Sequence, residues 1–167
     1  MTAARIIGLA AVKEGKRAIA FPSFTVERRG APVMAFVRIG EGEVTDRSFI
    51  YSPDYVLIFD PKLITHPSVK VGVKEDTCFL VNAKSKEEAA PLGAKRLALV
   101  DALNIAMELL GAPIVNTAMC GAFAAFSKLI GVEALEAAIM EVLPSKIAPR
   151  NVEAALRAYE EVEVWTS

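Results

Sequence analysis

The polar segment 23–32 combines residue types that could bind a charged ligand or partner. Glu27 precedes the adjacent Arg28 and Arg29, and Gly30 follows them. An Arg guanidinium presents paired donors in a fixed geometry that suits a carboxylate or a phosphate, and Glu27 could orient the neighbouring guanidinium. A solvated loop explains the same residues, since exposed ion pairs contribute only about 0–1 kcal/mol each. Both interpretations stay open, and the candidate binding residues in this segment are Ser23, Glu27, Arg28, Arg29 and Gly30.

Asn116 and Thr117 form a second candidate, because they fall near the start of a helix expected over 114–130. Asn and Thr side chains at such a position cap free backbone N–H groups, and this role alone would explain them. Alternatively, the helix N-terminus could receive an anionic group, since its amides and its dipole favour negative charge.

The cysteines and the histidine indicate no metal site in this chain. Cys78 and Cys120 lie in separate apolar stretches, and a [4Fe-4S] cluster needs about four thiolates, so the chain cannot hold one alone. We expect both cysteines to be buried and reduced. His66 precedes Pro67 without neighbouring ligands, which is typical of a surface turn. We therefore assign neither a catalytic residue nor a metal ligand to this chain.

Composition excludes several classes of protein. The chain has 167 residues, of which 53% are hydrophobic, so it is not a disordered chain. Its net charge is −1, and this balance argues against a nucleic-acid partner. No apolar stretch reaches the roughly 18 residues of a membrane span, and the N-terminal stretch lacks a cleavage-type ending. We expect a cytoplasmic protein with no membrane partner.

The elements that must position the candidate residues follow an α/β order. A helix is expected over 2–14 and a strand over 17–22, while a strand at 33–39 is expected to return through 44–51 as an antiparallel hairpin. Further strands are expected at 55–60, 69–73, 78–82 and 97–100, and further helices at 102–110, 114–130, 133–143 and 152–162. This order predicts a Rossmann-like layered sheet, mostly parallel with an antiparallel hairpin, with helices on both faces and a helical C-terminal layer. We expect residues 1–167 to form a single domain.

Three motifs carry a resemblance to a known family. They are AFPSFTVERRGAPVMAFVRI at 20–39, YSPDYVLIFDPKLI at 51–64 and GAPIVNTAMCGAF at 111–123, followed by the ending NVEAALRAYE at 151–160. In this order they resemble the gamma subunit of pyruvate (2-oxoacid):ferredoxin oxidoreductase over nearly the whole chain.

The family's gamma domain usually opens with a strand and a Gly-rich loop of the kind GRGGQG, which this sequence lacks. Met1 stands where the family often has Val, and Thr2-Ala3-Ala4-Arg5 follow as in the family. We therefore expect that the start was assigned too late, at a GTG codon that encodes Val internally. Reading the DNA immediately upstream would test this expectation.

The resemblance implies a subunit of an enzyme that converts pyruvate and coenzyme A to acetyl-CoA and CO2 while reducing ferredoxin. It implies alpha, beta and delta partner subunits, with thiamine pyrophosphate, Mg and [4Fe-4S] clusters held by the complex and no cofactor bound by this chain alone. Ferredoxin would be a partner through the complex. Alternatives are a gamma-type subunit acting on 2-oxoisovalerate, 2-oxoglutarate or indolepyruvate, or a free-standing nucleotide-binding module. The last would need a GxGxxG turn, which is absent from the sequence.

Overall fold

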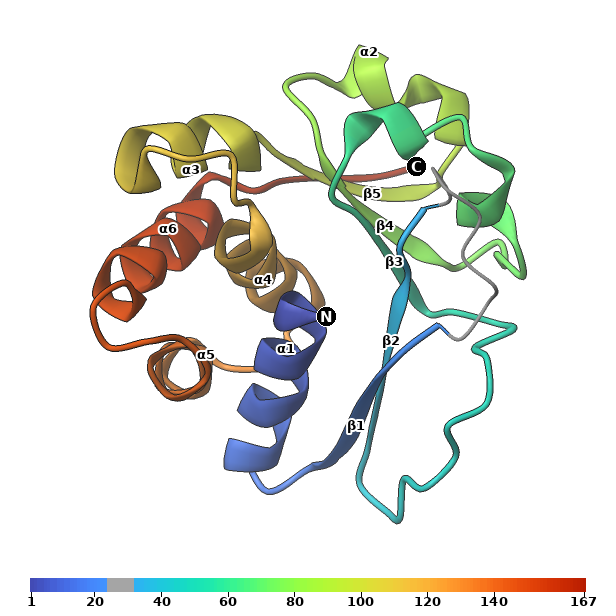
Figure 1. Cartoon of the computed structure of the whole chain (residues 1–167). Coiled ribbons are helices and arrows are strands. Elements are labelled where there is room, and N and C mark those ends of the chain that lie inside the picture. The colour runs from blue at the N-terminus through green and yellow to red at the C-terminus, as the bar shows by residue number, and fades with distance from the viewer. Residues whose placement is uncertain (24–31) are drawn as a thin grey trace.

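A computed structural model describes residues 1–23 and 32–167 of the chain, which form an α/β fold (Figure 1). Strands and helices mix along the first two thirds of the chain, and helices dominate the last third. The main elements, in chain order, are α1 (Thr2–Lys13), β1 (Arg17–Pro22), β2 (Ala35–Gly40), β3 (Tyr55–Ile58), β4 (Cys78–Asn82), α2 (Lys86–Ala89), β5 (Arg96–Val100), α3 (Ala102–Leu110), α4 (Asn116–Ser127), α5 (Val132–Val142), α6 (Ala148–Glu161) and β6 (Glu163–Thr166). Three short 3-10 helices complete the list: η1 (Pro61–Leu63), η2 (Pro67–Lys70) and η3 (Ala90–Leu92).

The larger sheet has the strand order β3-β4-β5-β6. Strands β3, β4 and β5 run parallel, whereas β6 joins β5 in the antiparallel sense. Every residue of β4 is buried, as expected for a central strand covered on both faces. The strand expected at 55–60 is present as β3, which is only partly buried because it pairs with a single neighbour among the described strands.

Alternate residues of the strands enter two separate cores. Leu80 and Ala98 belong to a large core shared with α1, α3, α4, α5 and α6, whereas Phe79 and Leu97 belong to a smaller core on the opposite face. That second face is covered by α2 and the 3-10 helices. The expected fold class, with helices on both faces and a helical C-terminal layer, is confirmed. In the described part of the chain, no helix is both long enough and apolar enough to cross a membrane.

A two-stranded antiparallel ribbon joins β1 to β2, with Arg17 opposite Gly40 and Pro22 opposite Ala35. The antiparallel pair is therefore present, but the predicted pairing of 33–39 with 44–51 is wrong. Asp46 accepts hydrogen bonds from the backbone N–H and the hydroxyl of Ser48, at 2.7 Å and 2.9 Å. This local turn satisfies backbone groups that a strand would otherwise pair, and β2 takes β1 as its neighbour.

The strand predicted at 69–73 is also wrong, because the chain forms η2 there. Pro67 stands at its first position, and the His66 ring accepts a hydrogen bond from the backbone N–H of Ser68. Gly72 then adopts a positive φ of 71°, where an added Cβ would lie 1.7 Å from the carbonyl oxygen of Tyr51. His66 is exposed, which confirms its place in a surface turn.

Helix boundaries follow local signals where these exist. Gly111, with φ of 66°, ends α3 at the predicted residue, Leu110. Helix α4 is shorter than predicted and ends at a left-handed Lys128, while α6 begins earlier than predicted with Pro149 in its first turn. Strand β6 was not predicted at all.

Helices α4 and α6 approach closely at Gly121. A Cβ on Gly121 would lie 1.8 Å from the carbonyl oxygen of Ala155, so only glycine fits against the α6 backbone. The small residues Ala118, Gly121 and Ala122 are all buried along α4, so this face of the helix permits close packing inside the protein.

We expect Gly121→Ala to destabilise the protein strongly, because relieving the clash requires α4 and α6 to move apart. Overpacking of this kind costs about 1–3 kcal/mol or more. Ala125→Gly, one turn further along α4, gives the comparison for a change of helix propensity, expected at about 1 kcal/mol. Urea unfolding followed by circular dichroism measures both. A Gly121→Ala protein as stable as the unmodified chain would contradict the packing described here.

Candidate functional site

Thr117 is buried between two helices and does not face solvent. It is 1% exposed, and its hydroxyl donates a hydrogen bond to Oδ1 of Asn151, 2.9 Å away in α6. Asn151 is 7% exposed, and its Nδ2 donates in turn to the carbonyl oxygen of Ile147, at 2.9 Å. The start of α4 is thereby joined to the first turn of α6, and the Thr117 hydroxyl is committed to this contact.

Asn116 lies beside Thr117 but has a different environment. It is half-buried, and its side chain makes no hydrogen bond to a described residue. Val115 occupies the N-cap position of α4, and no side chain among the described residues caps the helix. The predicted capping role of Asn116 and Thr117 is therefore wrong, because the helix begins one residue too early for either side chain to act as its cap. Whether Asn116 contacts an anionic group stays a prediction.

Ser23 lies at the end of β1, where its backbone N–H donates to the carbonyl oxygen of Met34 at 3.0 Å. This bond extends the β1–β2 ribbon by one pair toward the predicted binding segment. Ser23 and the pair Asn116–Thr117 thus belong to different layers of the fold, the ribbon and the helical layer. The other candidates of the segment, namely Glu27, Arg28, Arg29 and Gly30, lie outside the described residues.

Polar side chains at the carboxyl edge of the parallel strands are used for capping. Asp60 accepts from the backbone N–H of Lys62, and Asp101 accepts from that of Asn104, each at 3.0 Å. Buried Asn82 donates to the carbonyl oxygen of Phe59 and accepts from the backbone N–H of Leu103. Ligands commonly bind at this edge of open α/β sheets, but here the three side chains fasten the loops and helices that follow the strands.

The described residues do not form a ligand set for an iron–sulfur cluster or for Mg. Both cysteines are buried and free, as predicted. Burial raises the pKa of each thiol, that of Cys120 to about 12, which disfavours the thiolate that would bind a metal. Within residues 1–23 and 32–167, no three His, Cys, Asp or Glu side chains gather in a way that could hold a metal ion.

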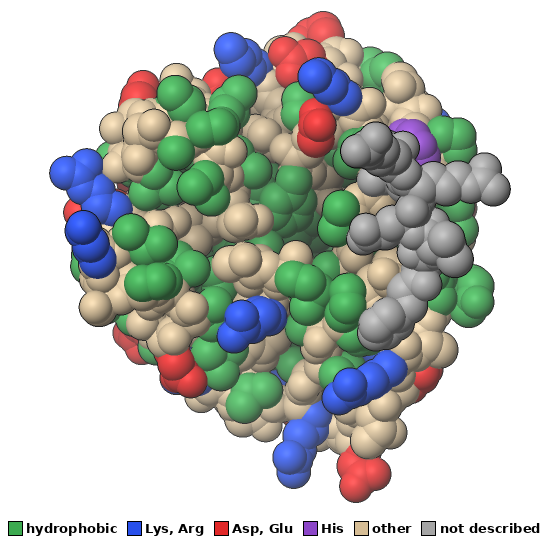
Figure 2. Space-filling model, in the orientation of Figure 1, with side chains coloured by type: hydrophobic (Ala, Val, Ile, Leu, Met, Phe, Trp, Pro, Cys, Tyr) green, Lys and Arg blue, Asp and Glu red, His purple; other side chains and the backbone are tan. Residues whose placement is uncertain are grey.

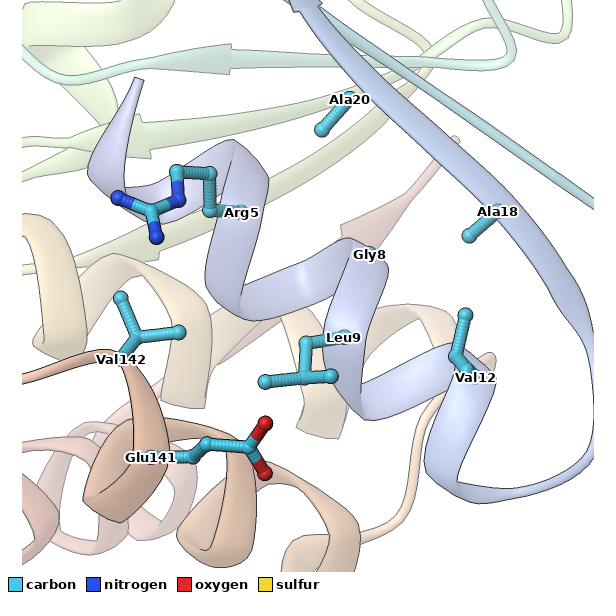
Figure 3. Close-up of a pocket in the computed structure, with 8 residues that line it drawn as sticks. All are labelled: Arg5, Gly8, Leu9, Val12, Ala18, Ala20, Glu141 and Val142. Atoms are coloured by element: carbon cyan, nitrogen blue, oxygen red, sulfur yellow. The ribbon is translucent and has the colours of Figure 1, made fainter.

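A groove of about 370 Å³ runs along the exposed face of α1 (Figure 3). Helix α1 lies between β1 on one side and α5 on the other. An added Cβ on Gly8 would be 3.7 Å from that of Ala20 and 3.9 Å from that of Ala18, so small side chains keep helix and ribbon close. The residues lining the groove are Arg5, Gly8, Leu9, Val12, Ala18, Ala20, Glu141 and Val142.

Charged side chains fasten α1 to the neighbouring α5. Nζ of Lys13 lies 2.6 Å from Oε2 of Glu141. Glu14 accepts from Nζ of Lys16 at 2.9 Å and from the backbone N–H of Gly131 at 2.7 Å. The hydrogen bond from the Lys16 ammonium is the main reason why the pKa of Glu14 lies below its usual value, and the bond from the Gly131 amide lowers it further. Because each of these bonds is partly exposed to solvent, it contributes little to the free energy of folding. Its effect is mainly to orient the two helices.

Arg5 is the residue of this groove that sequence reasoning did not select. Its side chain is exposed, and its guanidinium makes no hydrogen bond or ion pair with a described residue. The available signal was its position, since Arg5 interrupts an otherwise apolar stretch of α1.

Comparison with known proteins places this fold in a class. The family described as pyruvate ferredoxin/flavodoxin oxidoreductase matches residues 1–161. The pyruvate synthase subunit PorC of Methanothermobacter thermautotrophicus is 45% identical over 163 residues, which cover 98% of this chain and 89% of that protein. The Pyrococcus abyssi pyruvate/ketoisovalerate oxidoreductases common subunit gamma is 45% identical over 169 residues, with coverage of 99% and 91%.

A solved structure agrees with these relatives. The pyruvate oxidoreductase subunit PORC from Thermotoga maritima superimposes with a TM-score of 0.82 at 33% identity, covering 98% of this chain and 89% of that one. The molecule is thus an α/β subunit of the kind that contributes to a larger oxidoreductase. It belongs to the pyruvate ferredoxin/flavodoxin oxidoreductase family, as a subunit of the gamma type. The resemblance seen in the three sequence motifs is confirmed.

We expect Thr117→Val to destabilise the chain, because it leaves the buried Oδ1 of Asn151 without its donor. An unsatisfied buried polar group costs about 1–3 kcal/mol. Thr117→Ser keeps the hydroxyl and should lose less, while Asn116→Ala removes a side chain without a described partner and should change stability by no more than about 0.5 kcal/mol. Chemical unfolding of the three variants provides the comparison, and equal stability of the Val and Ser variants would contradict it.

Proposed function

We propose that this chain is the gamma subunit of a cytoplasmic pyruvate:ferredoxin oxidoreductase. The complex would cleave the bond between the carboxylate and the carbonyl carbon of pyruvate and join the acetyl group to the sulfur of coenzyme A. Carbon dioxide leaves, and the two electrons released pass to ferredoxin. The observation that carries the proposal is the 45% identity, over nearly the whole chain, to relatives named for pyruvate.

The chain would act in this reaction by binding and positioning rather than by supplying the reactive centre. Thiamine pyrophosphate, Mg and [4Fe-4S] clusters, which the family implies, would stabilise the carbanion and carry the electrons. The described residues do not fit a [4Fe-4S] cluster, because the two thiols are buried with raised pKa values, and no three of their His, Cys, Asp or Glu side chains gather as a metal ion would require. We therefore place these cofactors on alpha, beta and delta partner subunits, and ferredoxin would dock on the complex.

One observation favours a second substrate. The Pyrococcus abyssi relative is named as a gamma subunit common to pyruvate and ketoisovalerate oxidoreductases. A shared subunit cannot by itself select one 2-oxoacid, so the choice between pyruvate and 2-oxoisovalerate would depend on the companion subunits. This chain could then serve both reactions, and no feature of its described residues favours 2-oxoglutarate or indolepyruvate.

Reconstitution from separately purified subunits tests the proposed function. We expect this chain alone to convert no pyruvate, the alpha, beta and delta subunits together to show little coenzyme A-dependent ferredoxin reduction, and the full set to recover it. The same assay with 2-oxoisovalerate reports whether the companion subunits decide the substrate. Turnover by this chain alone, or failure of the companion subunits to bind it, would overturn the proposal.

The segment 23–32 is proposed to contact coenzyme A or a partner subunit through Arg28 or Arg29. Because a charge-assisted hydrogen bond contributes about 1.5–3 kcal/mol, Arg28→Ala and Arg29→Ala should each weaken assembly or raise the KM for coenzyme A about tenfold or more. The stability of the isolated chain should change little. Arg47→Ala, at an exposed position whose side chain has no described partner, is the matched control. If both variants assemble and turn over like the unmodified chain, this segment is a solvated loop.

A further inference from the structure

We infer that the groove along α1 is a docking site for an acidic, apolar segment of a companion subunit. An aliphatic side chain of that segment would enter the groove, and a neighbouring carboxylate would pair with Arg5. The inference rests on the proposed function, since it assumes that the chain works within a multi-subunit complex. It adds the surface and the chemistry through which one partner is recognised.

The shape of the groove suits a side chain presented by another protein. Arg5, Gly8, Leu9 and Val12 follow the i, i+3, i+4, i+7 spacing and so form one stripe along α1. Gly8 of α1 lies opposite the small side chains of Ala18 and Ala20 on β1, so no large side chain fills this part of the groove (Figure 3). Val12 is 48% exposed although it is an apolar side chain, so it offers apolar surface to a partner. An aliphatic side chain that is desolvated in such a pocket can anchor a protein–protein interface.

The charges of the groove specify an acidic occupant. Glu141 is the acidic residue of its lining, and Lys13 already neutralises it. Arg5 has no ion pair or hydrogen bond with a described residue, so the groove keeps one uncompensated positive charge. A guanidinium pairs with a carboxylate through two parallel hydrogen bonds, which are stronger when apolar contacts exclude water around them. The free charge and the apolar walls therefore favour an occupant with an aliphatic side chain beside an Asp or Glu.

A second copy of this chain fits the groove less well. In a symmetric dimer the same patch meets itself, so Arg5 would have to find an acid within the lining of the partner copy. Glu141 is committed to Lys13, and the remaining lining residues are apolar. Figure 2 shows apolar side chains that line a hollow on one face of the molecule, and α1 lies at that face in the same orientation (Figure 1), so this face suits a larger partner.

Charge reversal at Arg5 tests the inference. The binding of the full chain to a purified alpha–beta–delta subcomplex would be measured by biolayer interferometry. We expect Arg5→Glu to weaken binding about tenfold or more, because it places like charges together, and Arg5→Gln to have a smaller effect of the same sign. Val12→Asp should also weaken binding. Lys62→Glu is the matched control, since Lys62 is an exposed cation in η1, against the opposite face of the sheet, and has no described side-chain partner.

Folding of each variant is checked by its thermal unfolding midpoint, and a photo-crosslinking residue at position 12 identifies the occupant. A cross-link to an acidic, apolar peptide of a companion subunit supports the inference. A cross-link to a second copy, or Arg5→Glu binding as tightly as Lys62→Glu, overturns it and leaves the proposed function intact. If the unmodified chain does not bind the subcomplex, the proposed function and the inference both fail.

Discussion

The close approach of α4 and α6 is the contact on which the helical layer depends. Gly121 allows the helices to meet at backbone distance, and Thr117 with Asn151 fixes their register through a buried hydrogen bond. Steric contact alone would permit the helices to slide, whereas a buried polar pair has one position at which both partners are satisfied. Because α6 leads directly into β6, this register also determines where the last strand joins β5. The sheet and the helical layer are thus positioned by the same pair of helices.

Local signals in the sequence predicted most elements, but not their partners. Gly111 ends α3 where expected, and the apolar run 78–82 is a strand, because both features depend on neighbouring residues alone. The partner of β2 depends instead on α1, which lies against the ribbon, and on the turn at Asp46 and Ser48. Strand β6 is short and partly exposed, and it forms because β5 offers an unpaired edge. Strand pairing that depends on residues distant in the sequence leaves no pattern in the sequence of the strand itself.

The candidate site was predicted less completely than the fold, for a similar reason. Thr117 is a sensible residue for a helix start, and nothing near it in the sequence shows that its hydroxyl is used by Asn151 in another helix. Arg5 differs from Thr117, because its guanidinium makes no bond to a described residue and is therefore available for a partner. Only the packed structure reveals this. Composition and charge argue against whole classes of function, whereas the geometry decides which polar groups remain available.

If the reactive centre lies on companion subunits, as proposed, this subunit is constrained mainly at its surfaces. Its core must be stable, yet its buried groups, including both thiols, take no part in chemistry as long as burial holds them protonated. Contributions to turnover must then come from exposed groups that make no hydrogen bond or ion pair within the chain. Many α/β proteins bind ligands at the carboxyl edge of the sheet. Here the side chains at that edge already accept hydrogen bonds from backbone N–H groups, as Asp60, Asn82 and Asp101 do. The uncommitted charge on α1 lies elsewhere, between the ribbon and α5, so recognition by this chain is expected at the helix face rather than at the carboxyl edge of the sheet.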